Sequence, residues 1–224
     1  MNTIKWRSER SSWLKTCVVL FIMISASSMA NLITNGDFES GTNGWLIATS
    51  PAEPAGVVAV TTTNSPFSSG SSALQMIDGA VDAGQSATKD FGAQANGKFN
   101  LSFDYKVTTT SNSYWRGSLC TSAGVGESFN FSIYQNSFYI GTTNVAAGLS
   151  TGTWYRVSMI LDSAADKVLS GSITPFGGGS ATTWGEIAGL ATTAEIKRLV
   201  ISDNNSTPVA PSIVLDNVSL SAIP

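Results

Sequence analysis

The chain has 224 residues, of which 42% are hydrophobic and 12% are charged, and its formal net charge is −3. An acidic chain without a cluster of basic residues is a poor partner for nucleic acid or for an anionic membrane surface. The sequence contains no histidine, which removes the most common general base and the most common zinc ligand. We therefore expect neither nucleic-acid binding nor a histidine-dependent active site.

The first 30 residues have the three-part pattern of a secretory signal peptide. Four basic side chains precede an apolar run over 17–24, and Ser28 and Ala30 occupy the positions that a signal peptidase reads. The apolar run is too short to span a membrane, which needs about 20 residues. We expect cleavage after Ala30 and a secreted protein, with a retained amphipathic anchor as the alternative.

Residues 31–224 are expected to form one domain, because single all-β domains often reach about 200–250 residues. Loss of the leader removes four basic residues and one acidic residue, which leaves a net charge of −6. Cys120 is then the only cysteine, so no intrachain disulfide can form. The domain, expected to be a monomer, must therefore depend on its hydrophobic core or on a bound metal for its stability.

The pattern of residues 31–224 is β-structured almost throughout. Residues 99–107, FNLSFDYKV, alternate strictly between apolar and polar side chains, as in a strand with one buried face. Apolar runs of strand length extend the pattern over 128–134, 154–161, 168–173, 198–202 and 212–220.

Polar tracts separate these runs. The tracts over 61–72 and 177–183 are rich in Ser, Thr, Gly and Asn and read as loops, while capping-box spacing in 192–199 indicates at most one helical turn. Many short strands with turn-rich connections predict an all-β fold, an antiparallel two-sheet β-sandwich or jelly roll.

Acidic pairs suited to catalysis are not evident in the sequence. Glycoside hydrolysis needs two carboxylates about 5–10 Å apart, and no strand carries acidic residues at alternating positions. Asp162 and Asp166 lie at a hairpin turn, and Asp78 and Asp82 lie in a loop, where we interpret them as solvated. We expect a non-catalytic protein, with a polysaccharide-active jelly-roll enzyme as the third hypothesis.

The last strand contains a carboxylate in an apolar context. In a regular strand Asp216 would share a face with Val214, Val218 and Leu220, and a buried carboxylate is costly unless it is paired or bound to a cation. Neither terminal strand supplies Lys or Arg. Glu39 and Asp216 together would form an oxygen-rich site of the kind that Ca²⁺ prefers. Alternatively, Asp216 caps backbone amides at a bulge and Glu39 precedes a turn.

The two ends of this region resemble a known family. NLITNGDFESGTNGW (31–45) resembles the first strand of carbohydrate-binding modules of the family 4/9 type, which are galactose-binding-like β-sandwiches, and LDNVSL (215–220) resembles their closing strand. The resemblance implies a structural Ca²⁺ at the seam of the terminal strands. Its implied ligands are the side chains of Glu39 and Asp216 and a backbone carbonyl near Gly36.

The middle and the C-terminus carry different resemblances. The stretch 151–173, with Trp-Tyr opening a strand and a hairpin, is similar to laminin-G and concanavalin-type jelly rolls, which implies the same fold class but another ligand face. DNVSLSAIP (216–224) resembles secreted bacterial proteins that continue into a Pro-Glu-Pro sorting tag, which this chain lacks. This supports a second hypothesis, an extracellular-matrix or surface protein without a specific glycan ligand.

Candidate sugar-binding residues lie in polar stretches that also contain aromatic side chains. Sugar rings stack on aromatic faces, and their hydroxyls need amide, carboxylate or guanidinium partners. The candidates are Tyr114, Trp115, Arg116, Tyr134, Gln135, Asn136, Tyr139 and Trp184. Large aromatics in sandwiches are more often core residues, and we assign Trp45 and Trp154 to the core. The first hypothesis is thus a secreted polysaccharide-binding sandwich with structural calcium.

Overall fold

The computed structural model describes residues 30–49, 56–63, 65–67, 69–78, 85–108, 114–120, 127–188, 195–203 and 212–224. The predicted signal peptide, apart from Ala30, lies outside these ranges, so its cleavage stays a prediction. Within the described ranges no helix is long and apolar enough to cross a membrane.

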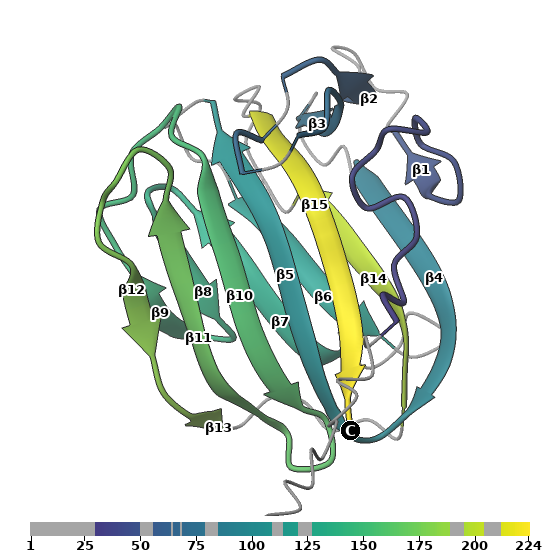
Figure 1. Cartoon of the computed structure of the whole chain (residues 1–224), viewed down its shortest axis with the longest axis vertical. Coiled ribbons are helices and arrows are strands. Elements are labelled where there is room, and N and C mark those ends of the chain that lie inside the picture. The colour runs from purple at the N-terminus through teal and green to yellow at the C-terminus, as the bar shows by residue number, and fades with distance from the viewer. Residues whose placement is uncertain are drawn as a thin grey trace, which may run out of the picture.

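Two antiparallel sheets pack face to face, as the sequence predicts (Figure 1). The first has seven strands in the spatial order β1 (Leu46–Ala48), β4 (Ser86–Ala95), β14 (Glu195–Asp203), β6 (Tyr114–Cys120), β7 (Glu127–Tyr134), β8 (Ser137–Ile140) and β9 (Thr143–Ala146). The second has eight strands: β12 (Thr182–Trp184), β11 (Lys167–Pro175), β10 (Tyr155–Asp162), β5 (Lys98–Val107), β15 (Ser212–Ile223), β3 (Ala73–Ile77) and β2 (Val57–Thr61), with β13 (Ile187–Ala188) paired to β11.

The ends of the described chain lie together at one seam. The Leu32 N–H donates a hydrogen bond to the Leu220 carbonyl at 2.7 Å, and Asn31 forms an antiparallel bridge with Ser221. The N-terminal segment therefore lies against β15.

The core lies between the two sheets and follows the predicted alternation. All five apolar residues of β5, from Phe99 to Val107, are buried, as are Phe129 and Phe131 of β7. The rings of Phe103 and Phe131 stack across the interface with centroids 4.8 Å apart. Burial of each such side chain stabilises the fold by roughly 1.5–3 kcal/mol.

The prediction of a helical turn over 192–199 is wrong for 195–199, the part of this stretch that the structure describes. Glu195 to Leu199 belong to strand β14, whose pairing with β4 shifts register between Ile196 and Arg198. Because of this bulge, Ile196 and Leu199 both face the core although they are three residues apart. Residues three apart also share one face of a helix, so the bulged strand has a helix-like spacing of apolar residues in the sequence.

The polar stretch that contains Tyr114, Trp115 and Arg116 belongs to a regular strand, β6. Trp115, Gly117 and Leu119 all face inward, but the glycine interrupts the apolar alternation. A Cβ on Gly117 would lie 2.0 Å from Cζ of Phe131, so the ring occupies the space of a side chain. The strand is therefore regular in structure although its pattern is hidden in sequence.

A bulge in β15 reverses the expected orientation of Asp216. The register with β5 shifts between Asp216 and Ser219, and Asn217 has a φ of 51°. Leu215 before the bulge and Val218 after it both belong to the main core. Asp216 therefore faces away from the partner sheet rather than toward it, which corrects the interpretation based on a regular strand.

Candidate functional site

Three tyrosines lie on the outer face of the seven-stranded sheet. Because Trp115, Ile133 and Phe138 point into the core, their neighbours Tyr114 and Tyr134 point outward. Tyr139 of β8 shares that outer face. The strands β6, β7 and β8 are adjacent, and Tyr114 lies directly opposite Tyr134 in the ladder. We call Tyr114, Tyr134 and Tyr139 the tyrosine face.

The tyrosine face lines an open hollow of about 390 Å³. The rings of Tyr114 and Tyr134 meet edge to face with centroids 5.5 Å apart, and those of Tyr134 and Tyr139 are tilted at 6.5 Å. The complete lining is Tyr114, Ser132, Tyr134, Tyr139, Gly141 and Thr142. The hollow thus combines aromatic surface with phenol and alcohol hydroxyls.

Two amide side chains hold the phenol groups. Gln135 Nε2 donates a hydrogen bond to the Tyr134 hydroxyl at 3.2 Å, and Asn144 Nδ2 donates one to the Tyr139 hydroxyl at 3.4 Å. Each phenol oxygen therefore accepts from the protein and keeps its own O–H to donate to a ligand. Tyr134 is 40% exposed, so its ring is available from solvent.

The remaining predicted residues near this hollow have separate places. Arg116 lies on the same outer face, directly opposite Ser132. Gln135 and Asn136 form the two-residue turn between β7 and β8, where Gln135 has a φ of 51°. Asn136 is exposed, and its backbone carbonyl accepts a hydrogen bond from the Leu149 N–H.

Two predicted tryptophans do not belong to the tyrosine face. Trp115 is 1% exposed and points into the core, so its ring offers no face to a ligand, and the prediction for it is wrong. Trp184 lies on β12 of the other sheet, covers Gly171 and packs against Phe138 with centroids 6.0 Å apart. It lines a different hollow, of about 320 Å³.

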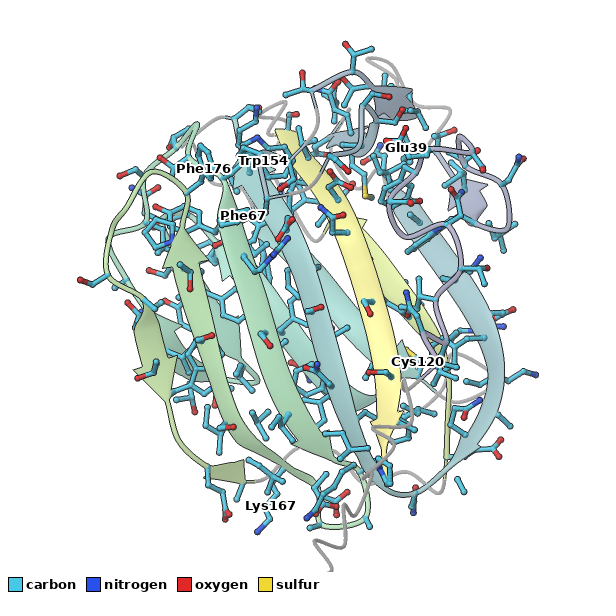
Figure 2. The ribbon with its side chains drawn as sticks, in the orientation of Figure 1. Glu39, Phe67, Cys120, Trp154, Lys167 and Phe176 are labelled. Carbon is cyan, nitrogen blue, oxygen red and sulfur yellow. The ribbon has the colours of Figure 1, made fainter. Side chains whose placement is uncertain are left out.

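Trp45 and Trp154 are both buried, in agreement with their assignment to the core. Trp45 belongs to the main core, whereas Trp154 forms a small second cluster with Val214 and Ala73 on the outer side of the eight-stranded sheet. Phe67 covers this second cluster (Figure 2).

Residues that line the hollow but were missed in the sequence are Ser132, Gly141 and Thr142. Ser132 could have been found, because it is two residues before Tyr134 and alternation places both on one face. Gly141 and Thr142 connect β8 to β9, and no signal in the sequence assigns that turn to the tyrosine face.

The Glu39 carboxylate binds a loop on the eight-stranded side of the sandwich. It accepts hydrogen bonds from the Ser71 N–H at 2.6 Å, the Ser72 N–H at 2.7 Å and the Ser71 hydroxyl at 3.0 Å. The bonds from these backbone amides lower the pKa of Glu39. Glu39 thus fastens the segment before β3.

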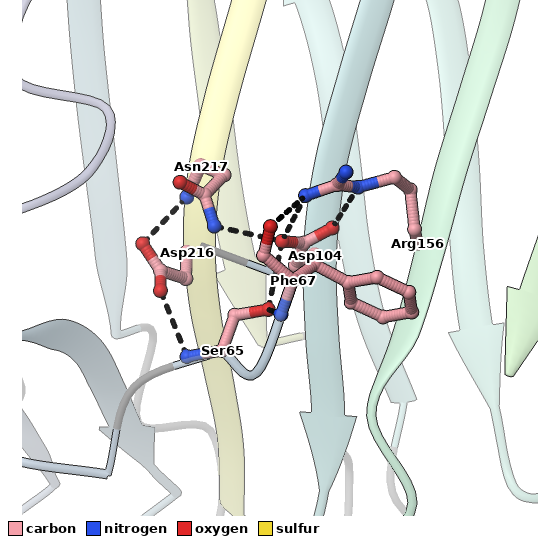
Figure 3. A network of polar contacts seen from close by, with 6 residues as sticks. All are labelled: Ser65, Phe67, Asp104, Arg156, Asp216 and Asn217. Carbon is pink, nitrogen blue, oxygen red and sulfur yellow. Dashed lines mark hydrogen bonds and ion pairs between the residues drawn. The ribbon is translucent and has the colours of Figure 1, made fainter. Parts of the chain in front are cut away.

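Asp216 belongs to a buried polar network with Asp104 and Arg156 (Figure 3). Its two oxygens accept hydrogen bonds from the Ser65 N–H at 2.9 Å and the Asn217 N–H at 2.7 Å. Asp104 lies directly opposite Asp216 in the ladder and is fully buried.

The Arg156 guanidinium neutralises one of the two carboxylates. It binds both oxygens of Asp104, at 2.8 and 2.9 Å, and lies over the Phe67 ring at 4.7 Å. Ser65 Oγ and Asn217 Nδ2 also donate hydrogen bonds to Asp104. The network therefore fastens segment 65–67 to the sheet.

The titration of Asp216 is expected to make stability depend on pH. Burial raises the pKa of Asp216 to about 6, the amides of Ser65 and Asn217 oppose this rise, and the charges of Asp104 and Asp37 add to it. Because the pKa is raised on folding, the contribution of Asp216 to stability is fully present below about pH 4 and is lost as pH rises through 6.

The Asp216→Asn variant should therefore lose this pH dependence. Chemical denaturation of both proteins from about pH 4 to neutral pH provides the measurement. Between about pH 4 and pH 7 we expect the free energy of unfolding of the wild type to fall by up to about 3 kcal/mol relative to that of the variant. Equal pH profiles would contradict the assignment.

The predicted calcium ligands have other partners in this structure. The oxygens of Glu39 and Asp216 accept amide hydrogen bonds, and the Gly36 carbonyl accepts one from the Val218 N–H at 2.9 Å. In the described part of the chain, no three His, Cys, Asp or Glu side chains gather around a common point. Calcium binding stays a prediction.

Comparisons with known proteins identify the fold. No protein-family model matches the chain, and no curated protein is similar to it in sequence. A carbohydrate esterase, vb_24B_21, from the Shiga toxin-encoding bacteriophage phi24B is similar in structure, with a TM-score of 0.58 and 12% identity over 88% of this chain and 100% of that one.

Two further solved structures share the architecture. The cellulose induced protein Cip1 has a TM-score of 0.58 and 15% identity, covering 84% of this chain and 96% of that one. Lectin II from Ulex europaeus has a TM-score of 0.55 and 9% identity, covering 80% and 92%. This chain has the two-sheet β-sandwich fold found in lectins. At these identities the likeness concerns the fold alone.

Proposed function

We propose that the protein is a secreted, non-catalytic carbohydrate-binding protein and that the tyrosine face binds a polysaccharide. The observation that carries the proposal is the convergence of Tyr114, Tyr134 and Tyr139 from three adjacent strands on one open hollow. The lectin among the structural neighbours supports the same class of ligand.

The chemistry of the hollow suits a sugar that carries no charge. Aromatic rings offer a flat apolar surface for the C–H face of a pyranose, and hydroxyl groups at the rim can bind its hydroxyls. Ser132 and Thr142 supply alcohol groups that both donate and accept hydrogen bonds. Because the hollow is open, it suits a segment of a longer chain rather than an enclosed monosaccharide.

Affinity electrophoresis through gels that contain individual neutral or acidic polysaccharides tests the proposal. We expect at least one polysaccharide to retard the folded protein, and free oligosaccharide of the same polymer to restore its mobility. Unchanged mobility across the whole panel would overturn polysaccharide binding and would favour a structural role at the cell surface.

The second part of the proposal is that the protein binds a structural calcium ion, which can be tested independently of polysaccharide binding. A hollow of about 570 Å³ lies at the seam of the terminal strands, and its lining includes Gly36 but neither Glu39 nor Asp216. If the folded protein binds calcium there, chelation should lower the melting temperature, because a ligand that binds only the native state stabilises it. An unchanged melting temperature after chelation would contradict calcium binding.

A further inference from the structure

Asn-Gly pairs are the sites in proteins most open to spontaneous deamidation. The backbone nitrogen of the glycine attacks Cγ of the asparagine, ammonia leaves, and water then opens the succinimide ring to aspartate or isoaspartate. Glycine favours the attack because it has no Cβ and because its backbone adopts many conformations. Folding controls the rate by fixing the two reacting groups or by leaving them free.

The chain has three Asn-Gly pairs, at 35–36, 43–44 and 96–97. Two of them are restrained. Asn35 Nδ2 donates hydrogen bonds to the carbonyls of Gly41 and Asn43, and its Oδ1 accepts one from the Ser40 N–H. At the third pair, the Gly97 N–H donates to Ser163 Oγ at 3.1 Å, so the attacking nitrogen is engaged.

The pair Asn43–Gly44 lacks the restraints found at the other two Asn-Gly pairs. Asn43 is exposed, and its side chain makes no hydrogen bond with the part of the chain that the structure describes. Within the same ranges the Gly44 N–H also has no acceptor, and Gly44 has a φ of 76°. Both reacting groups are therefore available.

A buried cation lies beside this pair. Lys89 is 4% exposed, and its Nζ would be 2.7 Å from a Cβ on Gly44. Its ammonium group lies 5.9 Å from the centroid of the Trp45 ring, and no described carboxylate pairs with it. Burial lowers the pKa of Lys89, which indicates that an added negative charge nearby would be stabilised.

We propose that Asn43–Gly44 is a built-in deamidation site whose reaction is promoted by the neighbouring Lys89 ammonium. Attack requires the Gly44 amide to lose its proton, and a cation beside the resulting anion stabilises it. The N–Cγ bond forms, the Cγ–Nδ2 bond breaks with loss of ammonia, and water hydrolyses the ring. The product carries a new carboxylate next to Lys89.

The isoaspartate product would also change the local backbone. The Thr42 carbonyl accepts a hydrogen bond from the Trp45 N–H at 2.9 Å, which closes the turn around Asn43. An additional main-chain carbon inside this turn would displace Trp45 or the carbonyl of Asn43 that Asn35 binds. The modification therefore acts on the seam between the N-terminal segment and the core.

Peptide mapping by mass spectrometry tests the proposal on the intact chain in mildly alkaline buffer. Rates at the three Asn-Gly pairs are measured in the folded protein and again in denaturant, which gives each pair its own reference. We expect folding to slow Asn35 and Asn96 by at least roughly tenfold, since reaction there requires local opening, and to leave Asn43 as fast or faster.

The Lys89→Met variant removes the ammonium group and so tests its contribution to the rate. We expect the rate at Asn43 to fall by roughly tenfold while the rates at Asn35 and Asn96 stay as in the wild type, which also reports that the variant is folded. The Asn43→Gln variant should lose the acidic product. If folding slows Asn43 as much as the other two pairs, the site is refuted; if the Lys89→Met variant reacts unchanged, the role of Lys89 is refuted.

Discussion

Replacement of Tyr134 and Tyr139 together with alanine is expected to weaken polysaccharide binding by about a hundredfold. Each ring contributes stacking area at the centre of the hollow, and loss of one such anchor costs about 1–2 kcal/mol, where 1.4 kcal/mol corresponds to a factor of ten. Both side chains point outward, so the core keeps its packing. Titration calorimetry with the polysaccharide that retards the wild type provides the measurement.

The matched control is Phe176→Ala. Phe176 is 51% exposed and packs against Phe67 at the end of the eight-stranded sheet (Figure 2), so the substitution removes an exposed ring from another face. This control should bind as the wild type does. Equal affinities of the double variant and the control would show that the tyrosine face is not the binding face.

Loss of Arg156 is expected to produce the largest effect on stability. The Arg156→Ala variant leaves Asp104, which is fully buried, without its cation and beside Asp216. Removal of one partner of a buried pair costs about 3–5 kcal/mol, and partial exposure of Arg156 reduces this to about 2–4 kcal/mol. Chemical denaturation at neutral pH measures the change in the free energy of unfolding.

A second ion pair of the same geometry serves as the control. Arg198 binds both oxygens of Asp90, at 2.8 and 3.2 Å, but Asp90 is exposed. The Arg198→Ala variant should therefore lose less than about 1 kcal/mol. If the two variants lost similar free energies of unfolding, the buried network would not stabilise the fold more than an exposed ion pair does.

Regular strands were predictable because burial of one face requires apolar and polar residues to alternate along the sequence. Phe99, Leu101 and Phe103 alternate with polar residues in β5, and the structure buries each of them. Strand β6 was missed because Gly117 stands where the pattern needs an apolar side chain, and the Phe131 ring fills that place from the next strand. Such compensation between strands cannot be read from one segment alone.

The candidate site was predictable in part for the same reason. The tyrosines were recognised by their polar surroundings. The sequence did not show which of Tyr114 and Trp115 faces the core, because that depends on where β6 begins. Asp216 was misplaced because the bulge at Asn217 changes the face of every residue before it. The cation nearest to it in the network, Arg156, binds Asp104 on the strand between them, and only the strand order brings the three residues together.

Nitration of tyrosine with and without bound polysaccharide tests the central claim most directly. The chain has five tyrosines; Tyr105 and Tyr155 are buried, and the other three form the tyrosine face. We predict that bound polysaccharide protects Tyr114, Tyr134 and Tyr139 from nitration, while Tyr105 and Tyr155 stay unmodified in both states. Unchanged nitration of these three tyrosines in a saturated complex would place the ligand elsewhere and contradict the account.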